Sequence, residues 1–142
     1  MRYCKIRDVA DPVRAHEHDA GIDFFVPNDF QEVELEPGMR INIPSGIKVD
    51  VQPGFALIAF NKSGVASKTG LVAGACVIDS GYEGEMHLNM INTSNDDVLI
   101  QPGAKILQFI QLPISCEPLE RAEEDQMWNR STRGSAGFGS TG

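Results

Sequence analysis

The sequence of 142 residues contains no apolar run that approaches the roughly 20 residues of a membrane-spanning helix. Its first residues, Met1 to Lys5, also lack the apolar stretch of a secretion signal. Basic side chains are scarce: 12 Lys and Arg stand against 20 Asp and Glu, a formal net charge of −8. We therefore expect a soluble, intracellular protein without membrane contact, whose acidic surface repels bulk nucleic acid.

Cysteine is scarce too, with three residues at distant positions, Cys4, Cys76 and Cys116. An odd number of scattered cysteines cannot form a fully paired disulfide framework. The pair His16 and His18 matches no zinc signature, and its acidic surroundings are typical of a solvated loop. We expect buried, unreactive thiols, and a single domain, which is usual for a chain of this length.

Proline and glycine occur side by side in three places, at 37–38, 53–54 and 102–103. This order predicts type II turns with the two residues at the central positions. Apolar residues alternate with polar ones in 39–43, 47–51 and 86–90, and 55–60, 71–78 and 104–112 are apolar runs of strand length. The sequence thus predicts an all-β antiparallel barrel or sandwich, jelly-roll topology being one solution, with at most one short helix beginning near Ser63.

The C-terminal part breaks the strand pattern. Residues 113–130 contain two prolines and a charged cluster, which predicts an extended connection. The glycine-rich end carries Arg133, whose fork suits phosphate oxygens, and Phe138, whose ring suits stacking on a base. We expect a β-barrel body over residues 1–127 and a flexible arm over 128–142 that wraps a ligand; a disordered end is the alternative.

Two segments hold side chains suited to chemistry at phosphorus. An apolar strand runs into Asp79, where a carboxylate could orient and deprotonate a water, or could satisfy local N–H groups as a turn aspartate. Tyr82 fits either a ligand platform or a half-buried hairpin aromatic. Segment 61–70 mixes cations, hydroxyls and glycines at the expected helix start, whose N–H groups suit phosphate, but it lacks the P-loop spacing.

Taken in order, five segments resemble the five motifs of the trimeric deoxyuridine triphosphatase (dUTPase) family. They are residues 20–23, 62–64, 74–84, 103–108 and 133–142, so the resemblance spans nearly the whole chain. It implies a jelly-roll-like β fold assembled as a homotrimer. It also implies that three subunits build each active site and that the C-terminal arm of one subunit closes the site of another.

The resemblance further implies Mg²⁺-dependent hydrolysis of dUTP to dUMP and pyrophosphate by water attack on the α-phosphorus. In this reading Asp79 is the base that orients the water, Asp23 holds the water shell of the metal, and the backbone from Gly74 to Tyr82 reads uracil. Tyr82 excludes a 2′-hydroxyl. The implied substrate-binding residues are Lys62, Ser63, Gly64, Gly74, Val77, Ile78, Tyr82, Gln108, Arg133, Phe138, Gly139 and Ser140.

Four positions depart from the family pattern. Lys62 and Lys105 stand where the family commonly has arginine, which keeps the charge but loses the bidentate fork. Gly81 replaces a residue that is often acidic, and Ala136 replaces a frequent tail glycine.

Two other functions fit parts of the sequence. A dCTP deaminase resembles this family in fold and triphosphate site, and a non-catalytic trimeric β module could bind nucleotide or a regulatory protein partner. The presence of Asp79 with Tyr82 and of the complete tail favours hydrolysis.

Overall fold

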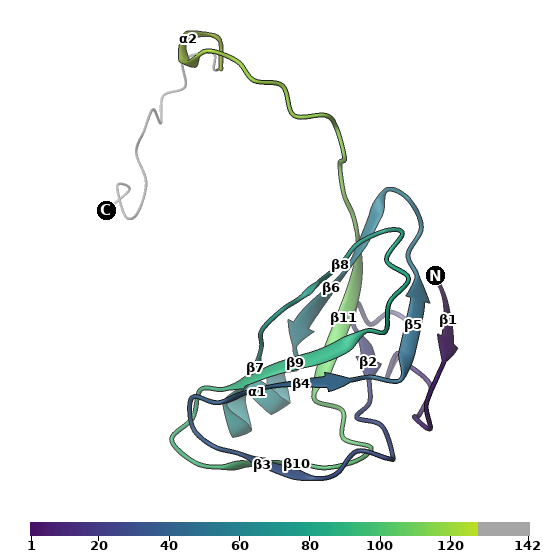
Figure 1. Cartoon of the computed structure of the whole chain (residues 1–142), viewed down its shortest axis with the longest axis vertical. Helices are drawn as coiled ribbons and strands as arrows, with labels where there is room; N and C mark the ends of the chain where they lie inside the picture. Colours follow the sequence, from purple (N-terminus) through teal and green to yellow (C-terminus); the bar gives the residue numbers. More distant parts are fainter. Residues whose placement is uncertain (128–142) are drawn as a thin grey trace.

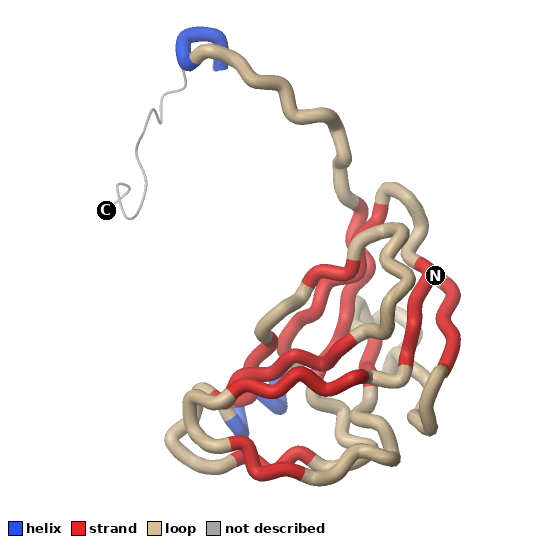
Figure 2. The backbone as a smooth tube through the Cα atoms, viewed as in Figure 1, coloured by secondary structure: helices blue, strands red, loops and turns tan. Residues whose placement is uncertain are grey.

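The computed structural model describes residues 1–127, which fold mainly into short β-strands (Figures 1 and 2). The strands are β1 (Arg2–Lys5), β2 (Ile22–Phe24), β3 (Val33–Leu35), β4 (Arg40–Pro44), β5 (Ile47–Asp50), β6 (Phe55–Asn61), β7 (Leu71–Ala73), β8 (Val77–Ile78), β9 (His87–Asn92), β10 (Val98–Ile100) and β11 (Leu107–Pro113). The helices of this part of the chain are α1 (Ser63–Thr69) and α2 (Glu124–Met127). Neither is long and apolar enough to cross a membrane.

Two main antiparallel sheets organise the body. One has the strand order β2-β11-β6-β8 and the other the order β4-β9-β7, while β1 pairs with β5 and β3 with β10. The long strands β6 and β11 pair along their whole length, from Leu107 opposite Asn61 to Pro113 opposite Phe55. Many short antiparallel strands confirm the all-β prediction.

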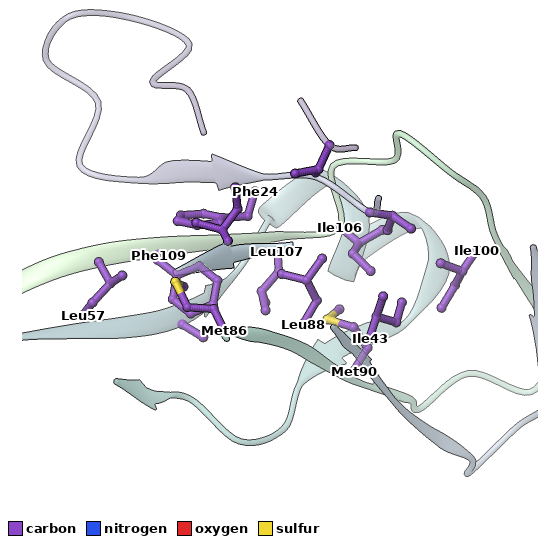
Figure 3. Packing of buried hydrophobic residues seen from close by; sticks show 14 of the residues in the cluster. Phe24, Ile43, Leu57, Met86, Leu88, Met90, Ile100, Ile106, Leu107 and Phe109 are labelled. Carbon is purple, nitrogen blue, oxygen red and sulfur yellow. The ribbon is translucent and has the colours of Figure 1, made fainter. Parts of the chain in front are cut away.

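The core lies between these two sheets (Figure 3). Along the β9 region Met86, Leu88 and Met90 are fully buried, whereas the residues between them are only half-buried. From the other sheet, the rings of Phe24 and Phe109 meet edge to face with centroids 4.8 Å apart. The period-two pattern of 86–90 therefore marks the face of β9 that packs on the core, as predicted.

The three Pro-Gly turns form as predicted. Gly38, Gly54 and Gly103 have φ values of 76°, 84° and 74°. In each turn the residue after glycine donates its N–H to the carbonyl of the residue before proline, at 3.1 to 3.2 Å. These are type II turns, which need a positive φ at the glycine position.

The apolar run 71–78 is divided between the two sheets. Strand β7 ends at Ala73, which pairs with Met90 in one sheet, and β8 begins at Val77, which pairs with Ile58 in the other. Residues 74–76 cross between the sheets. Apolar periodicity predicts extended backbone here, but it carries no information about which strand each residue pairs with.

After β11 the chain leaves the body as an extended segment (Figure 1). Leu119 on this segment is fully exposed. The extended connection is thus present as far as α2. This single helical turn is a second helix, where the sequence predicted at most one. Glu124 and Asp125 lie in its first turn, where acidic side chains interact favourably with the helix dipole. The predicted arm over 128–142 lies outside the described residues.

The prediction of buried thiols is wrong for this chain. Cys4 and Cys116 are exposed and Cys76 is half-buried. Cys4 lies on β1, whose four residues are all exposed, and Cys116 lies on the projecting segment. Whether a cysteine is buried depends on where its strand or loop packs, and the residue type alone does not determine this.

Candidate active site

The predicted base residue lies where β8 ends and the chain turns back toward β9. The Tyr82 N–H donates to the Asp79 carbonyl at 3.2 Å, which closes a tight turn. Gly81 in this turn has a φ of 83°, a left-handed conformation that glycine adopts without strain and that Asp and Asn tolerate. The turn therefore accepts both the glycine of this chain and an acidic residue. Asp79 itself is exposed at the strand end.

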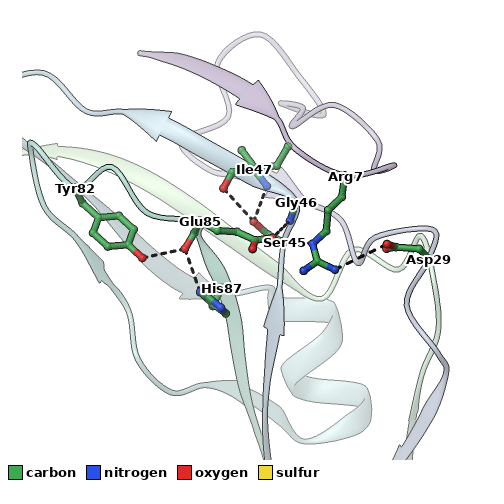
Figure 4. A network of polar contacts seen from close by, with 8 residues as sticks. All are labelled: Arg7, Asp29, Ser45, Gly46, Ile47, Tyr82, Glu85 and His87. Carbon is green, nitrogen blue, oxygen red and sulfur yellow. Dashed lines mark hydrogen bonds and ion pairs between the residues drawn. The ribbon is translucent and has the colours of Figure 1, made fainter.

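The position of Tyr82 is fixed by contacts within the loop 79–86 between β8 and β9, which is called the hairpin below although the two strands pair in different sheets (Figure 4). Its hydroxyl donates to the Glu85 carbonyl at 3.0 Å, and a Cβ at Gly84 would overlap the ring and hydroxyl of Tyr82. The Glu85 carboxylate in turn accepts hydrogen bonds from the Gly46 N–H at 2.8 Å and from Arg7 Nε at 3.1 Å. The hairpin is thus tied to the N-terminal segment and to the turn between β4 and β5.

A cavity of about 240 Å³ opens beside this hairpin. Its lining includes four predicted site residues, Val77, Ile78, Asp79 and Tyr82, together with side chains from β4, β9 and β11. Gly74, a fifth predicted residue, lies beside the cavity, and a Cβ there would overlap the side-chain oxygen of Asn89. The residues predicted to read the base and to hold the water therefore surround one cavity.

A second group of predicted residues gathers around a buried carboxylate on β2. Asp23 is 5% exposed and pairs with Lys62 Nζ and, at 3.5 Å, with Lys105 Nζ. Gln108 faces Asp23 across the β2–β11 ladder and donates to the Asn61 carbonyl at 2.7 Å. Both lysines at positions where the family commonly has arginine thus balance the charge of one buried acid.

Glycine at position 21 allows the Gln108 side chain to lie where it does. A Cβ there would overlap the side-chain oxygen of Gln108. The close approach of these two residues joins the first and fourth of the motif segments, and Lys62 joins the second to them through Asp23.

Helix α1 begins immediately after Lys62, which occupies the N-cap position without a side-chain cap. A surface depression of about 560 Å³ lies here and is lined by Lys62, Ser63, Gly64 and Gln108, with Lys68 from the last helical turn. Two cations and the uncapped first turn make this surface suitable for an anion, despite the acidic charge of the whole chain.

The two groups remain apart within one chain. The cavity beside the hairpin and the depression at α1 share no lining residue. The predicted arm residues Arg133, Phe138, Gly139 and Ser140 lie outside the described residues. The predicted residues of the described part of the chain therefore line two separate depressions.

The described residues contain no group of three or more His, Cys, Asp or Glu side chains that could hold a metal ion. His16 and His18 are exposed. A carboxylate offers about four lone-pair directions, so Asp23 can accept hydrogen bonds from water besides its two lysine contacts. This donor set fits a hydrated Mg²⁺ ion held mainly by phosphate and water, and it does not fit a site made of protein ligands alone.

Sequence reasoning missed Asn42 and Asn89, which line the cavity beside the hairpin. Asn89 and His87 alternate with the buried Leu88 and Met90, so they occupy the other face of β9. Their alternation with buried residues could have indicated that these polar side chains share one face of the strand. It could not have indicated whether that face meets solvent or lines a cavity.

The sequence is similar to that of known proteins over most of its length. The family model described as dUTPase matches residues 7–142. A deoxyuridine 5'-triphosphate nucleotidohydrolase of Neisseria meningitidis serogroup B is 37% identical over 134 residues, covering 92% of this chain and 87% of the relative. The enzyme of the same name from Mycobacterium sp. (strain JLS) is 36% identical over 144 residues, covering 96% and 90%.

Solved structures agree as well. The dUTPase of Staphylococcus bacteriophage 80alpha with dUpNHpp superimposes with a TM-score of 0.86 at 28% identity, covering 99% of this chain and 97% of that one. A D95N dUTPase from phage phi11 of S. aureus, described with a structural Mg(II) ion, gives a TM-score of 0.76 at 26% identity, covering 87% and 96%.

The jelly-roll-like fold and these similarities place the chain among the nucleotide hydrolases with a β-barrel fold. The chain belongs to the dUTPase family. Its enzyme class is that of the dUTP diphosphatases.

Proposed function

We propose that this protein hydrolyses dUTP to dUMP and pyrophosphate with Mg²⁺, by attack of water on the α-phosphorus, in a homotrimer whose subunits share active sites. The observation that carries the proposal is the separation of the two predicted residue groups. The cavity beside the hairpin is lined by the proposed water-activating acid, Asp79, but by no lysine or arginine, whereas the depression at α1 is lined by Lys62 and Lys68. A second copy of the chain would supply the missing group to each site, as in a symmetric oligomer.

The hairpin cavity suits the base and the sugar. Backbone C=O and N–H groups between Gly74 and Tyr82 can match N3–H and O4 of uracil, whereas cytosine would set like groups against each other. Thymine offers the same hydrogen-bonding edge, so its methyl group must be excluded by shape. The fixed ring of Tyr82 supports the sugar and leaves no room for a 2′-hydroxyl.

Asp79 is the proposed base. It is exposed at the mouth of the cavity, beyond the last paired residue of β8, so that a water can lie between its carboxylate and a bound phosphate. A carboxylate in this place orients the water and accepts its proton as the oxygen attacks phosphorus.

The depression at α1 suits the triphosphate. Lys62, Ser63, Gly64 and Gln108 provide a cation, a hydroxyl, backbone N–H groups and an amide on one surface. Asp23, kept in place by its lysine contacts, accepts hydrogen bonds from the water shell of the ion. When bound, Mg²⁺ neutralises phosphate charge and orients the phosphate chain.

The C-terminal arm completes the proposed site. Residues 128–142 form a separate unit from the barrel of residues 1–127 and close over the site of a neighbouring subunit. There Phe138 stacks on uracil and Arg133 clamps the terminal phosphates, with Gly139 and Ser140 alongside. Closure orders the water and the triphosphate together and excludes bulk solvent.

The test is pyrophosphate release from dUTP, dCTP, dTTP and UTP with Mg²⁺, by the wild type and by Asp79→Asn. We expect hydrolysis largely confined to dUTP, and a loss of roughly 10² to 10⁴ in kcat for the variant, because it keeps the shape but cannot accept a proton. The melting temperature of Asp79→Asn should match that of the wild type. No dUTP hydrolysis by the wild type would refute the proposal, and ammonia release from dCTP would favour the deaminase.

A further inference from the structure

Three consecutive residues, Gly74 to Cys76, carry the chain from one sheet to the other at the wall of the hairpin cavity. At the far end of this crossing, the Cys76 carbonyl accepts a hydrogen bond from the Ala59 N–H at 2.7 Å, which attaches it to β6. The near end, Gly74, keeps a backbone bond to β9, but the middle, Ala75, lies between the two ladders, because β7 stops at Ala73 and β8 starts at Val77. A side chain must therefore hold the middle.

Asn89 holds both Gly74 and Ala75. Its backbone carbonyl accepts the Gly74 N–H at 2.9 Å, and its side-chain Oδ1 accepts the Ala75 N–H at 3.0 Å. The side chain lies so close to the crossing that a Cβ at Gly74 would overlap Oδ1. One residue of β9 thus fixes two successive peptide units of the cavity wall.

Asn42 on β4 braces the Asn89 side chain from behind. The two residues face each other in the β4–β9 ladder, and Asn89 Nδ2 donates to Asn42 Oδ1 at 3.3 Å. The Ala75 N–H can only donate, so the Asn89 atom that faces it must be oxygen. The amide nitrogen therefore points at Asn42, which must present its own oxygen.

Ala75 is exposed, so water could satisfy its N–H if Asn89 did not. The bond to Oδ1 is therefore not needed to avoid a buried, unpaired donor, and its main effect is to fix the orientation of this peptide unit. Both asparagines also line the cavity themselves.

We propose that Asn89, braced by Asn42, is a positioning residue that aims the Gly74–Ala75 backbone at the base and so sets base affinity and specificity. This inference rests on the proposed function, in which the backbone from Gly74 to Tyr82 reads uracil. Asp79 is held independently, since β8 pairs with β6 through Ile78 opposite Leu57. Loss of the asparagine pair should therefore act on KM and on base choice more than on kcat.

The experiment compares wild type, Asn89→Val and Asn42→Val, which remove the acceptor and its brace with little change in volume. For Asn89→Val we expect KM for dUTP to rise roughly tenfold, as for one lost hydrogen bond, with kcat little changed. The preference for dUTP over dCTP should fall by a similar factor. Asn42→Val should give a smaller shift in the same direction. Because it leaves the sequence of β9 unchanged, it still tests the inference if Asn89→Val fails to fold.

A matched control is Asn92→Asp, on the same strand but away from the cavity. Asn92 Nδ2 donates to the Leu35 and Asp96 carbonyls, each at 2.8 Å, and the control loses both bonds. It should lower the melting temperature and leave KM and base preference unchanged.

Hydrogen exchange gives a second readout that needs no substrate. The Ala75 N–H should exchange faster in Asn89→Val than in wild type, while the Ala59 N–H should not. Unchanged KM and base preference in both valine variants, beside an active wild type, would overturn the inference and leave the proposed function standing. A wild type that does not hydrolyse dUTP would instead refute the proposed function, and unchanged exchange at Ala75 would then refute the positioning contact as well.

Discussion

At the scale of single residues, the buried Asp23 pairs with two lysines, Lys62 and Lys105, which differ in exposure. Lys62 Nζ is the closer partner and its side chain is 24% exposed, whereas Lys105 lies at 3.5 Å and is 45% exposed. The partly buried contact should contribute more, because a charged hydrogen bond strengthens as water is excluded, and an exposed one contributes little.

We predict that Lys62→Met lowers the free energy of unfolding by about 2 kcal/mol, since it leaves a buried carboxylate with one distant partner. Lys105→Met should cost under about 1 kcal/mol, as for an exposed pair. Denaturation in urea measures both. Lys62→Arg is the conservative control and should retain most of the stability. Equal losses in the two methionine variants would contradict the assignment of Lys62 as the main partner.

Residue patterns predicted the site unevenly. Asp79, Tyr82 and Gln108 lie in segments with distinctive glycines and polar side chains, so the motif order predicts them as site residues. It does not predict that Asp79 and Tyr82 line one cavity of the chain and Gln108 another depression. The role of Asn89 could not, because it depends on which peptide unit lies beside β9 after the chain crosses between the sheets. That proximity is a property of tertiary structure and leaves no local pattern.

At the scale of elements, the hairpin after β8 holds its tyrosine through contacts inside a few residues. The Tyr82 hydroxyl reaches the Glu85 carbonyl, and the ring fills the space above Gly84. Because Gly84 has no Cβ, the Tyr82 ring can occupy this space.

We predict that Gly84→Ala displaces the tyrosine ring and weakens the preference for dUTP over UTP. The reason is that the new Cβ and the ring cannot occupy the same space. Competing hydrolysis of the two nucleotides measures the effect. Tyr82→Phe is the matched control: it keeps the ring, loses the hydrogen bond of the hydroxyl, and should keep the preference. An unaltered ratio in Gly84→Ala would show that the ring does not select the sugar.

The elements themselves were largely predictable. Alternation located the strands at 39–43, 47–51 and 86–90, Pro-Gly pairs located three turns, and the helix begins at Ser63 as expected. The division of 71–78 between two sheets and the single turn α2 were not predicted. Pairing partners are set by distant parts of the chain, and a one-turn helix is too short to show a period.

At the scale of the whole molecule, two separate half-sites lead to a test by mixing. Asp79→Asn and Lys62→Met each damage a different half. If each site combines halves from two subunits, random mixed trimers should regain roughly a quarter of the intact sites, although each variant alone is impaired. Pyrophosphate release by co-expressed variants measures this. If both halves belonged to one subunit, mixing would restore nothing, and a light-scattering mass equal to that of a single chain would exclude shared sites.

A second prediction at this scale concerns the arm. Truncation after Met127 removes the residues proposed to stack on the base and clamp the phosphates. Turnover of dUTP should fall by orders of magnitude, because the truncated protein no longer positions the triphosphate or excludes water from it. The trimer mass and the melting temperature should stay near those of the full chain. Steady-state kinetics and light scattering on the same preparation check both parts. Normal turnover by the truncated protein would refute the arm assignment.

The crossing of the chain between its sheets also links substrate binding to thermal resistance. Because Asn89 belongs to one sheet and Ile78 to the other, any fluctuation that parts the sheets dismantles the cavity that both line. Nucleotide that binds only the joined state must then raise the unfolding temperature in proportion to the logarithm of its concentration. With dUTP bound in this cavity as proposed, the protein should be most resistant to heat when its substrate is abundant, so that an excess of the nucleotide protects the enzyme that removes it.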